Sequence, residues 1–212
     1  MNVCKSTIAG LAFLLFSFSS FAQEAPPKKM KYGIGMGLNY SQYYSNYSSP
    51  NYERDFNNHD PLIGFSMICT AERTLSNRFK ATLRPEIAFL GSKEKMFDAK
   101  TTNVNVVIPI SLHGRVVDHF YVHGGVGIEY VAGISSESEG DSRSVIEFVP
   151  NRWIPSVHTG VSYVVSNWVD IGIKYNYGLG SIQEFEINDF EGDMGLFKTK
   201  NSYYQFSVII RQ

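Results

Sequence analysis

The alternation that decides the fold is clearest in residues 31–41, which read KYGIGMGLNYS. Every second residue from Tyr32 to Tyr40 is apolar or aromatic, and the residues between them are small, polar or charged. In a β-strand successive side chains point to opposite faces, so the pattern predicts a strand with one apolar and one polar face.

Seven further segments repeat this alternation. They span about residues 61–73, 78–90, 102–115, 119–132, 153–165, 168–177 and 202–211. No long stretch shows helical spacing, so the chain is predicted to be all-β. The eight apolar faces contain no Asp, Glu, Lys or Arg. The opposite faces carry the charged residues and histidines Lys31, Glu72, Lys80, Arg84, Glu86, Arg115, Glu129, Asp170, Lys174, Arg211, His113, His123 and His158.

The direction in which the apolar faces point separates two architectures. A soluble lipocalin-like barrel binding a small apolar ligand would turn them inward, whereas a membrane barrel turns them toward lipid. Aromatic residues gather near the segment ends, and glycines fall on the charged faces, where a narrow lumen is crowded. Short connections near 75–77, 117–118 and 166–167 alternate with long ones at about 42–60, 91–101, 133–152 and 178–201. We therefore predict an eight-stranded antiparallel, up-and-down transmembrane β-barrel with both ends on the periplasmic side.

Charge and hydropathy exclude two other classes of protein. The formal net charge is −1, which removes the broad basic surface expected of a nucleic-acid-binding protein. The mean hydropathy of −0.14 excludes a polytopic helical membrane protein. It does not exclude a membrane barrel, because alternating apolar and polar residues cancel in the average.

The first residues have the features of a secretory signal. Lys5 precedes an apolar run from Ile8 to Phe18, and small residues lead to a cleavage site after Ala22. We expect a signal peptide over 1–22, a short linker over 23–30 and the barrel over 31–212. The mature chain then keeps only Cys69, which lies in an alternating apolar run and is predicted to be a small buried hydrophobe.

The inward charges are predicted to pair with one another, because unpaired charges in a narrow lumen are costly. Inward residues must lie opposite inward residues across a short turn, a rule that we call parity. It places Glu72 opposite Lys80, Thr70 opposite Thr82, and His113 opposite His123. The predicted salt-bridged lumen network comprises Glu72, Lys80, Arg84, Glu86, His113, His123, Glu129 and Lys174. An open pore is the alternative. A metal site at the histidines lacks a third ligand at tight spacing, and we expect no catalytic residues and no cofactor.

Two stretches resemble a known family. Residues 104–112, VNVVIPISL, followed by 121–127, YVHGGVG, are similar to a hairpin of the Bacteroidetes outer-membrane β-barrel domain, the PorT-like group. Residues 170–179, DIGIKYNYGL, resemble its penultimate strand. The resemblance covers about 31–211 and implies an eight-stranded outer-membrane barrel without catalytic residues. Chains of that group usually end in an aromatic residue, whereas this one ends Ile210-Arg211-Gln212. Either Phe206 takes that role or assembly is less efficient.

The long connections are predicted to lie outside the cell and to carry recognition. The first contains Tyr43, Tyr44, Tyr47 and Tyr52 among Asn and Ser residues, a mixture typical of adaptable binding surfaces. Acidic residues at 137–141 and 184–193 are candidates for bridging divalent cations to lipopolysaccharide. We expect a monomer in the Gram-negative outer membrane, in contact with lipid and lipopolysaccharide. Its role is predicted to be structural or in surface recognition, with an accessory function in protein secretion as the alternative.

Overall fold

The computed structural model describes residues 30–49, 52–56, 59–94, 99–138, 141–146, 153–188 and 194–212. The predicted signal peptide and nearly all of the predicted linker lie outside these residues. Within the described part of the chain, no helix is long and apolar enough to cross a membrane.

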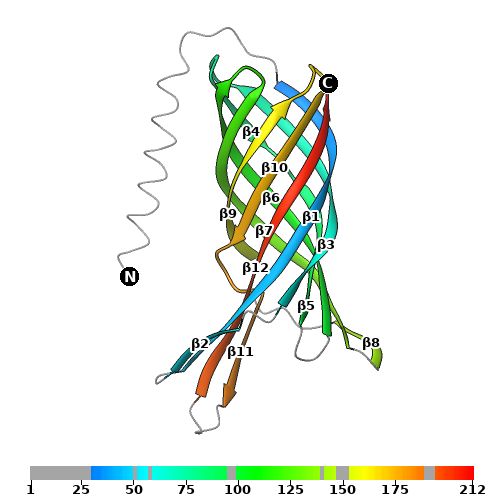
Figure 1. Ribbon diagram of the computed structural model, residues 1–212, viewed down its shortest axis with the longest axis vertical. Helices are drawn as coiled ribbons and strands as arrows, with labels where there is room; N and C mark the ends of the chain where they lie inside the picture. Colours follow the sequence, from blue (N-terminus) through cyan, green and yellow to red (C-terminus); the bar gives the residue numbers. More distant parts are fainter. Residues whose placement is uncertain are drawn as a thin grey trace.

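Antiparallel strands form a closed ring (Figure 1). The ring strands are β1 (Met30–Ser49), β3 (His59–Thr74), β4 (Phe79–Leu83), β5 (Glu86–Glu94), β6 (Ala99–Val117), β7 (Phe120–Ser138), β9 (Trp153–Val164), β10 (Val169–Gly178) and β12 (Met194–Arg211). β4 and β5 occupy one place between β3 and β6, interrupted at Pro85, which has no N–H to donate. Pairing of β12 with β1 closes the ring, so the predicted eight-stranded up-and-down barrel is confirmed.

Three short strands extend the sheet at the end of the barrel away from the C-terminus (Figure 1). They are β2 (Tyr52–Phe56), β8 (Asp141–Ile146) and β11 (Gln183–Asn188). β2 pairs with residues 45–49 of β1, and β11 pairs with residues 194–199 of β12. Because β1 and β12 also pair with each other here, a four-stranded sheet in the order β2-β1-β12-β11 continues beyond the ring. We call it the outer sheet.

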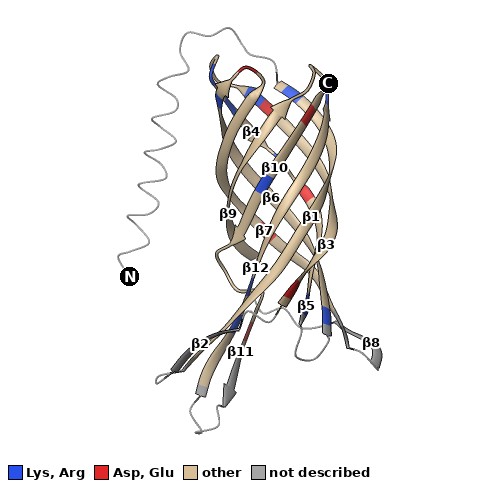
Figure 2. Ribbon diagram, in the orientation of Figure 1, with Lys and Arg blue, Asp and Glu red and all other residues tan. Residues whose placement is uncertain are grey.

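The apolar faces of all the ring strands point outward, as expected of a membrane barrel. Ile34 and Met36 on β1 are 68% and 67% exposed, and Ile63 on β3 is 78% exposed. Figure 2 marks few charged positions along the barrel strands. The alternative of a soluble lipocalin-like barrel, which needs these faces inside, is therefore wrong. The predicted burial of Cys69 is also wrong, because its place in the alternation puts it on the outward face.

Aromatic residues border this apolar belt at both ends. Tyr130 and Trp153 pack with ring centroids 4.7 Å apart toward the outer sheet. Trp168 is exposed beside the turn between β9 and β10, at the opposite end. On β1 the belt runs from Tyr32 to Tyr40, both more than half exposed. This arrangement matches the aromatic girdles of membrane barrels at the two lipid–water interfaces.

The strand register agrees with prediction in one hairpin and differs in another. His113 pairs with His123, as parity predicts. Glu72 pairs with Thr82 rather than with Lys80, a shift of two residues, so the predicted pairing of Thr70 with Thr82 is wrong as well. The shift arises because the turn is centred on Asn77, one residue later than predicted. A shift of two keeps every side chain on its predicted face.

The long connections contain more strand than predicted. β1 continues to Ser49 and β2 begins at Tyr52, so most of the predicted loop 42–60 is extended chain. β7 likewise continues to Ser138 and β12 begins at Met194. In residues 41–47 of β1 one face stays buried, but tyrosine and polar residues occupy both faces, so the apolar–polar contrast that marks a strand is lost.

Glycine allows close approach inside the ring. A Cβ at Gly125 would lie 2.0 Å from the carbonyl oxygen of Ile110 and 2.8 Å from the imidazole of His158. A Cβ at Gly35 would lie 2.4 Å from the carbonyl oxygen of Val208. At these inward positions only a residue without a side chain fits the narrow barrel.

Candidate functional site

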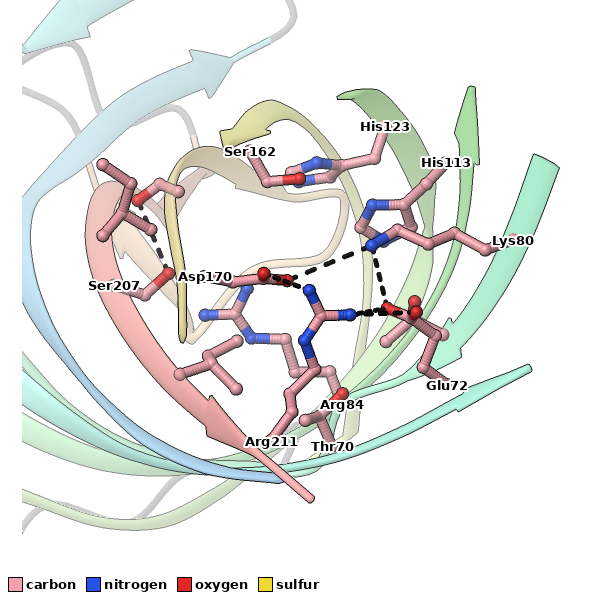
Figure 3. Close-up of a pocket in the computed structure, with 14 residues that line it drawn as sticks. Thr70, Glu72, Lys80, Arg84, His113, His123, Ser162, Asp170, Ser207 and Arg211 are labelled. Atoms are coloured by element: carbon pink, nitrogen blue, oxygen red, sulfur yellow. Dashed lines mark hydrogen bonds and ion pairs between the residues drawn. The ribbon is translucent and has the colours of Figure 1, made fainter. Parts of the chain in front are cut away.

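An ion-pair cluster occupies the short-turn end of the barrel interior (Figure 3). It consists of Glu72, Lys80, Asp170 and Arg211, all buried. Lys80 Nζ lies 2.8 Å from Glu72 Oε2 and 4.0 Å from Asp170 Oδ2. Arg211 Nη1 donates to both oxygens of Glu72 at 2.9 Å, and its Nη2 donates to Asp170. Two positive and two negative charges therefore compensate one another out of contact with bulk water.

Glu86 is the centre of a second cluster, deeper in the barrel. Its Oε1 accepts hydrogen bonds from Lys174 Nζ at 2.7 Å and from the Tyr203 hydroxyl at 2.9 Å. Gln205 Nε2 donates to Oε2 at 3.2 Å, and Gln205 Oε1 accepts from Arg84 Nη2 at 3.0 Å. Glu86 and Lys174 are each 2% exposed, so each charge depends on the other.

Glu129 forms a third cluster, in which its neighbours are amides. Asn176 donates to its Oε1 at 2.6 Å, and Asn105 and Asn201 donate to its Oε2 at 3.0 and 3.1 Å. Glu129 is fully buried. No basic side chain among the described residues lies within ion-pair distance of it. Hydrogen bonds from amides, rather than an opposite charge, hold this carboxyl group.

Apolar side chains close the interior at the end toward the outer sheet. Five buried residues pack together there: Tyr43, Val131, Ile134, Ile154 and Ile182. The Tyr43 hydroxyl donates to Asn103 Oδ1 at 2.5 Å, which joins this apolar plug to the amide cluster. The interior is thus layered, with ion pairs at one end and an apolar plug at the other.

The three predicted inward histidines lie together in the wall of the lumen. The rings of His113 and His123 stack with centroids 4.5 Å apart. His158 Nε2 lies 2.7 Å from the Ser111 hydroxyl. Among the described residues no group of three or more His, Cys, Asp or Glu side chains is arranged to hold a metal ion.

Two of the charges predicted to face inward lie at the rim instead. Lys31 and Arg115 are exposed, and Arg115 Nη1 lies 3.8 Å from Asp118 Oδ1. Both residues stand where their strands reach the short-turn end, so the interior no longer encloses them. They take no part in the buried clusters.

The predicted recognition tyrosines divide between the two faces of β1. Tyr43 and Tyr47 are 4% and 8% exposed and point inward, whereas Tyr44 is 37% exposed on the outer face. The side chain of Tyr52 lies outside the described residues. Of the acidic loop residues, Glu184 pairs with Lys198 at 3.1 Å, and the side chains at 137–141 and 186–193 also lie outside the described part. Inward burial leaves Tyr43 and Tyr47 unable to reach an external partner.

The charge pattern alone misses the buried amides that connect the clusters: Asn39, Asn103, Asn105, Asn176, Asn201 and Gln205. Their position in the alternation of each strand indicates that these amides face inward. Asn176 follows Lys174 by two residues, and Gln205 precedes Arg211 by six, so both share the inward face of a charged residue. Extending the alternation to every polar residue would have found them.

The comparison with known families identifies the barrel. The family model described as "Outer membrane protein beta-barrel domain" matches residues 21–184. The chain belongs to this family. It is therefore a protein of the Gram-negative outer membrane, with its barrel in the lipid bilayer.

Solved structures of several small outer-membrane proteins are similar to this family member. Ail, the attachment invasion locus protein of Yersinia pestis, is 13% identical, with 87% of this chain and 99% of that chain covered and a TM-score of 0.49. OprG of Pseudomonas aeruginosa is 12% identical, covering 87% and 97%, with a TM-score of 0.49. Neisserial surface protein A is 15% identical, covering 84% and 96%, with a TM-score of 0.47. No curated protein matched the chain in sequence.

Proposed function

We propose that this protein is a non-conducting outer-membrane barrel that recognises a partner at the cell surface through its outer sheet. The observation that carries the proposal is the continuation of β1 and β12 beyond the ring, with β2 and β11 added at their sides. Strands that leave the bilayer present backbone and side chains to the exterior. Among the described strands none pairs with the outer edge of β2 or of β11, so these edges are suited to strand addition by a protein partner.

Site-specific photocrosslinking tests the recognition role. A photoreactive residue at Tyr44, which lies on the outer face of β1 one residue before the pairing with β2 begins, is expected to capture a protein in intact cells. The same residue at Met36, in the middle of the apolar belt, serves as the matched control and is expected to capture lipid only. Absence of any protein adduct at Tyr44, or equal protein capture at both positions, would count against recognition by this region.

The layered interior supports a closed lumen. Ion pairs, amides and the apolar plug fill successive levels of the barrel, and an eight-stranded barrel has little space beyond its side chains. We expect the purified protein to give no stepwise conductance in a planar bilayer, with a large porin as the positive control. Steady single-channel currents that persist after repurification would contradict a closed lumen.

Export through a cleaved signal peptide is a further part of the proposal. It rests on Lys5, the apolar run from Ile8 to Phe18 and the small residues before Gln23. Intact-mass measurement of the protein from outer membranes is expected to give a chain beginning at Gln23. A mass that includes Met1 would show instead that the segment is retained.

The PorT-like group of Bacteroidetes is the branch that we propose for this chain. The proposal rests on the resemblance of residues 104–127, which form the paired strands β6 and β7. We also propose a monomer surrounded by lipid and lipopolysaccharide, because a closed ring leaves no barrel edge for a second copy to pair with.

A further inference from the structure

Arg84 is a buried charge without a carboxylate partner. It is 9% exposed, and its described hydrogen bond runs from Nη2 to the neutral amide of Gln205. No carboxylate among the described residues lies within ion-pair distance of it. An arginine side chain stays protonated in proteins, and the carboxylates of Glu86 and Asp170 act on its charge only from beyond ion-pair distance.

A small cavity lies beside Arg84 at the short-turn end of the lumen (Figure 3). Lys80, His113, His123 and Ser162 lie across from Arg84 and Arg211 in this view. Three basic residues and two acidic residues line the cavity: Lys80, Arg84, Arg211, Glu72 and Asp170. Because Lys80 and Arg211 are matched by the two carboxylates, the charge of Arg84 remains as a net positive charge on the lining.

Several polar atoms of the lining are buried without a hydrogen-bond partner in the described part of the chain. They are Thr82 Oγ1, Arg84 Nε, His113 Nδ1, His123 Nδ1, Ser162 Oγ and Arg211 Nε. The hydroxyl and guanidinium groups can all donate, and each imidazole can donate in one of its tautomers. Buried donors are normally satisfied, so a bound acceptor is expected among them.

We propose that this cavity binds one small inorganic anion of the halide class. A single negative charge would balance the one excess positive charge of the lining and accept hydrogen bonds from the surrounding donors. The cavity is about 30 Å³, and a water needs roughly 10–15 Å³ on the same measure, so there is room for a small ion with a water. A dianion such as sulfate would bring more negative charge than the one excess positive charge of the lining balances.

Bromide is the probe for a direct test, because its anomalous scattering separates it from water. Crystals of the full mature protein grown with bromide are expected to show an anomalous peak in the cavity, in contact with the Arg84 guanidinium. The Arg84→Gln variant should lose the peak. A cavity that holds only water at saturating bromide would overturn the proposal, and so would a site filled by sulfate but not by bromide.

A thermal measurement in detergent extends the test to solution. At constant ionic strength, replacing gluconate with bromide is expected to raise the unfolding midpoint by a few degrees over a roughly 100-fold concentration range and then to saturate. Arg84→Gln should abolish this rise. Arg115→Gln removes the same charge from the exposed rim and should keep it. An equal response in all three proteins would show a general salt effect and would overturn the site.

Discussion

Replacing Glu86 with glutamine is expected to lower the free energy of unfolding by about 3–5 kcal/mol. The substitution keeps the shape of the side chain but leaves the buried charge of Lys174 without its partner 2.7 Å away. It also turns an amide N–H toward Gln205 Nε2, which at present donates to Glu86 Oε2. Chemical denaturation of the barrel in lipid vesicles, followed by tryptophan fluorescence, measures the change.

Glu129→Gln is the matched control, because Glu129 is equally buried but is held by three amides. No lysine or arginine loses a partner there, so the loss of stability should be clearly smaller. In the double variant of Glu86→Gln with Lys174→Met, removal of the second charge should recover part of the stability. Equal losses for Glu86→Gln and Glu129→Gln would mean that the Lys174 ion pair contributes little.

The barrel could be predicted because lipid and lumen impose opposite demands on alternate residues. On β1 the lipid-facing positions from Tyr32 to Tyr40 must be apolar, whereas Gly35 must leave space inside. These demands depend only on whether a residue is odd or even along the strand, so the sequence shows which side chains face lipid and which face the lumen. Register depends on the turn as well, and the turn centred on Asn77 moved the pairing of Glu72 by two residues.

The β1–β2 side of the outer sheet escaped prediction for the same physical reason, whereas the apolar residues of 178–201 predict the hairpin that β11 and β12 form on the other side. Beyond the aromatic girdle, Tyr43 and Tyr47 face inward and Tyr44 faces outward, yet all are tyrosine. An alternation between identical residues gives no signal of a strand. β1 continues to Ser49 because it pairs with β2 on one side and with β12 on the other. These two partners lie far apart in the sequence.

Charged members of the interior and the Glu72–Lys80 pair follow from the alternation in the sequence, but the other partners do not. Lys80 contacts Glu72 diagonally rather than directly across the hairpin. Arg211 reaches Glu72 and Asp170 on two other strands. Such contacts depend on the tilt and stagger of the closed ring, which no local pattern specifies.

Met36→Arg is expected to destabilise the barrel by about 2–4 kcal/mol, because it places a charge near the middle of the lipid-facing belt. Met36 lies halfway between Tyr32 and Tyr40 and is 67% exposed. Met30→Arg makes the same exchange at the start of β1, where Met30 is 50% exposed beyond the girdle residue Tyr32. Near the interface the cost falls to about 0–1 kcal/mol.

The comparison of these two variants tests the position of the bilayer as well as its presence. Both exchange methionine for arginine on the same face of the same strand, so strand propensity and side-chain size cancel between them. The difference in unfolding free energy, measured in vesicles, then reports depth in lipid. If Met30→Arg were as costly as Met36→Arg, the hydrocarbon layer would have to extend past Tyr32. If neither were costly, the outward apolar face of β1 would not contact lipid. A large cost at Met36 alone would place Met36 inside the hydrocarbon layer and Met30 outside it.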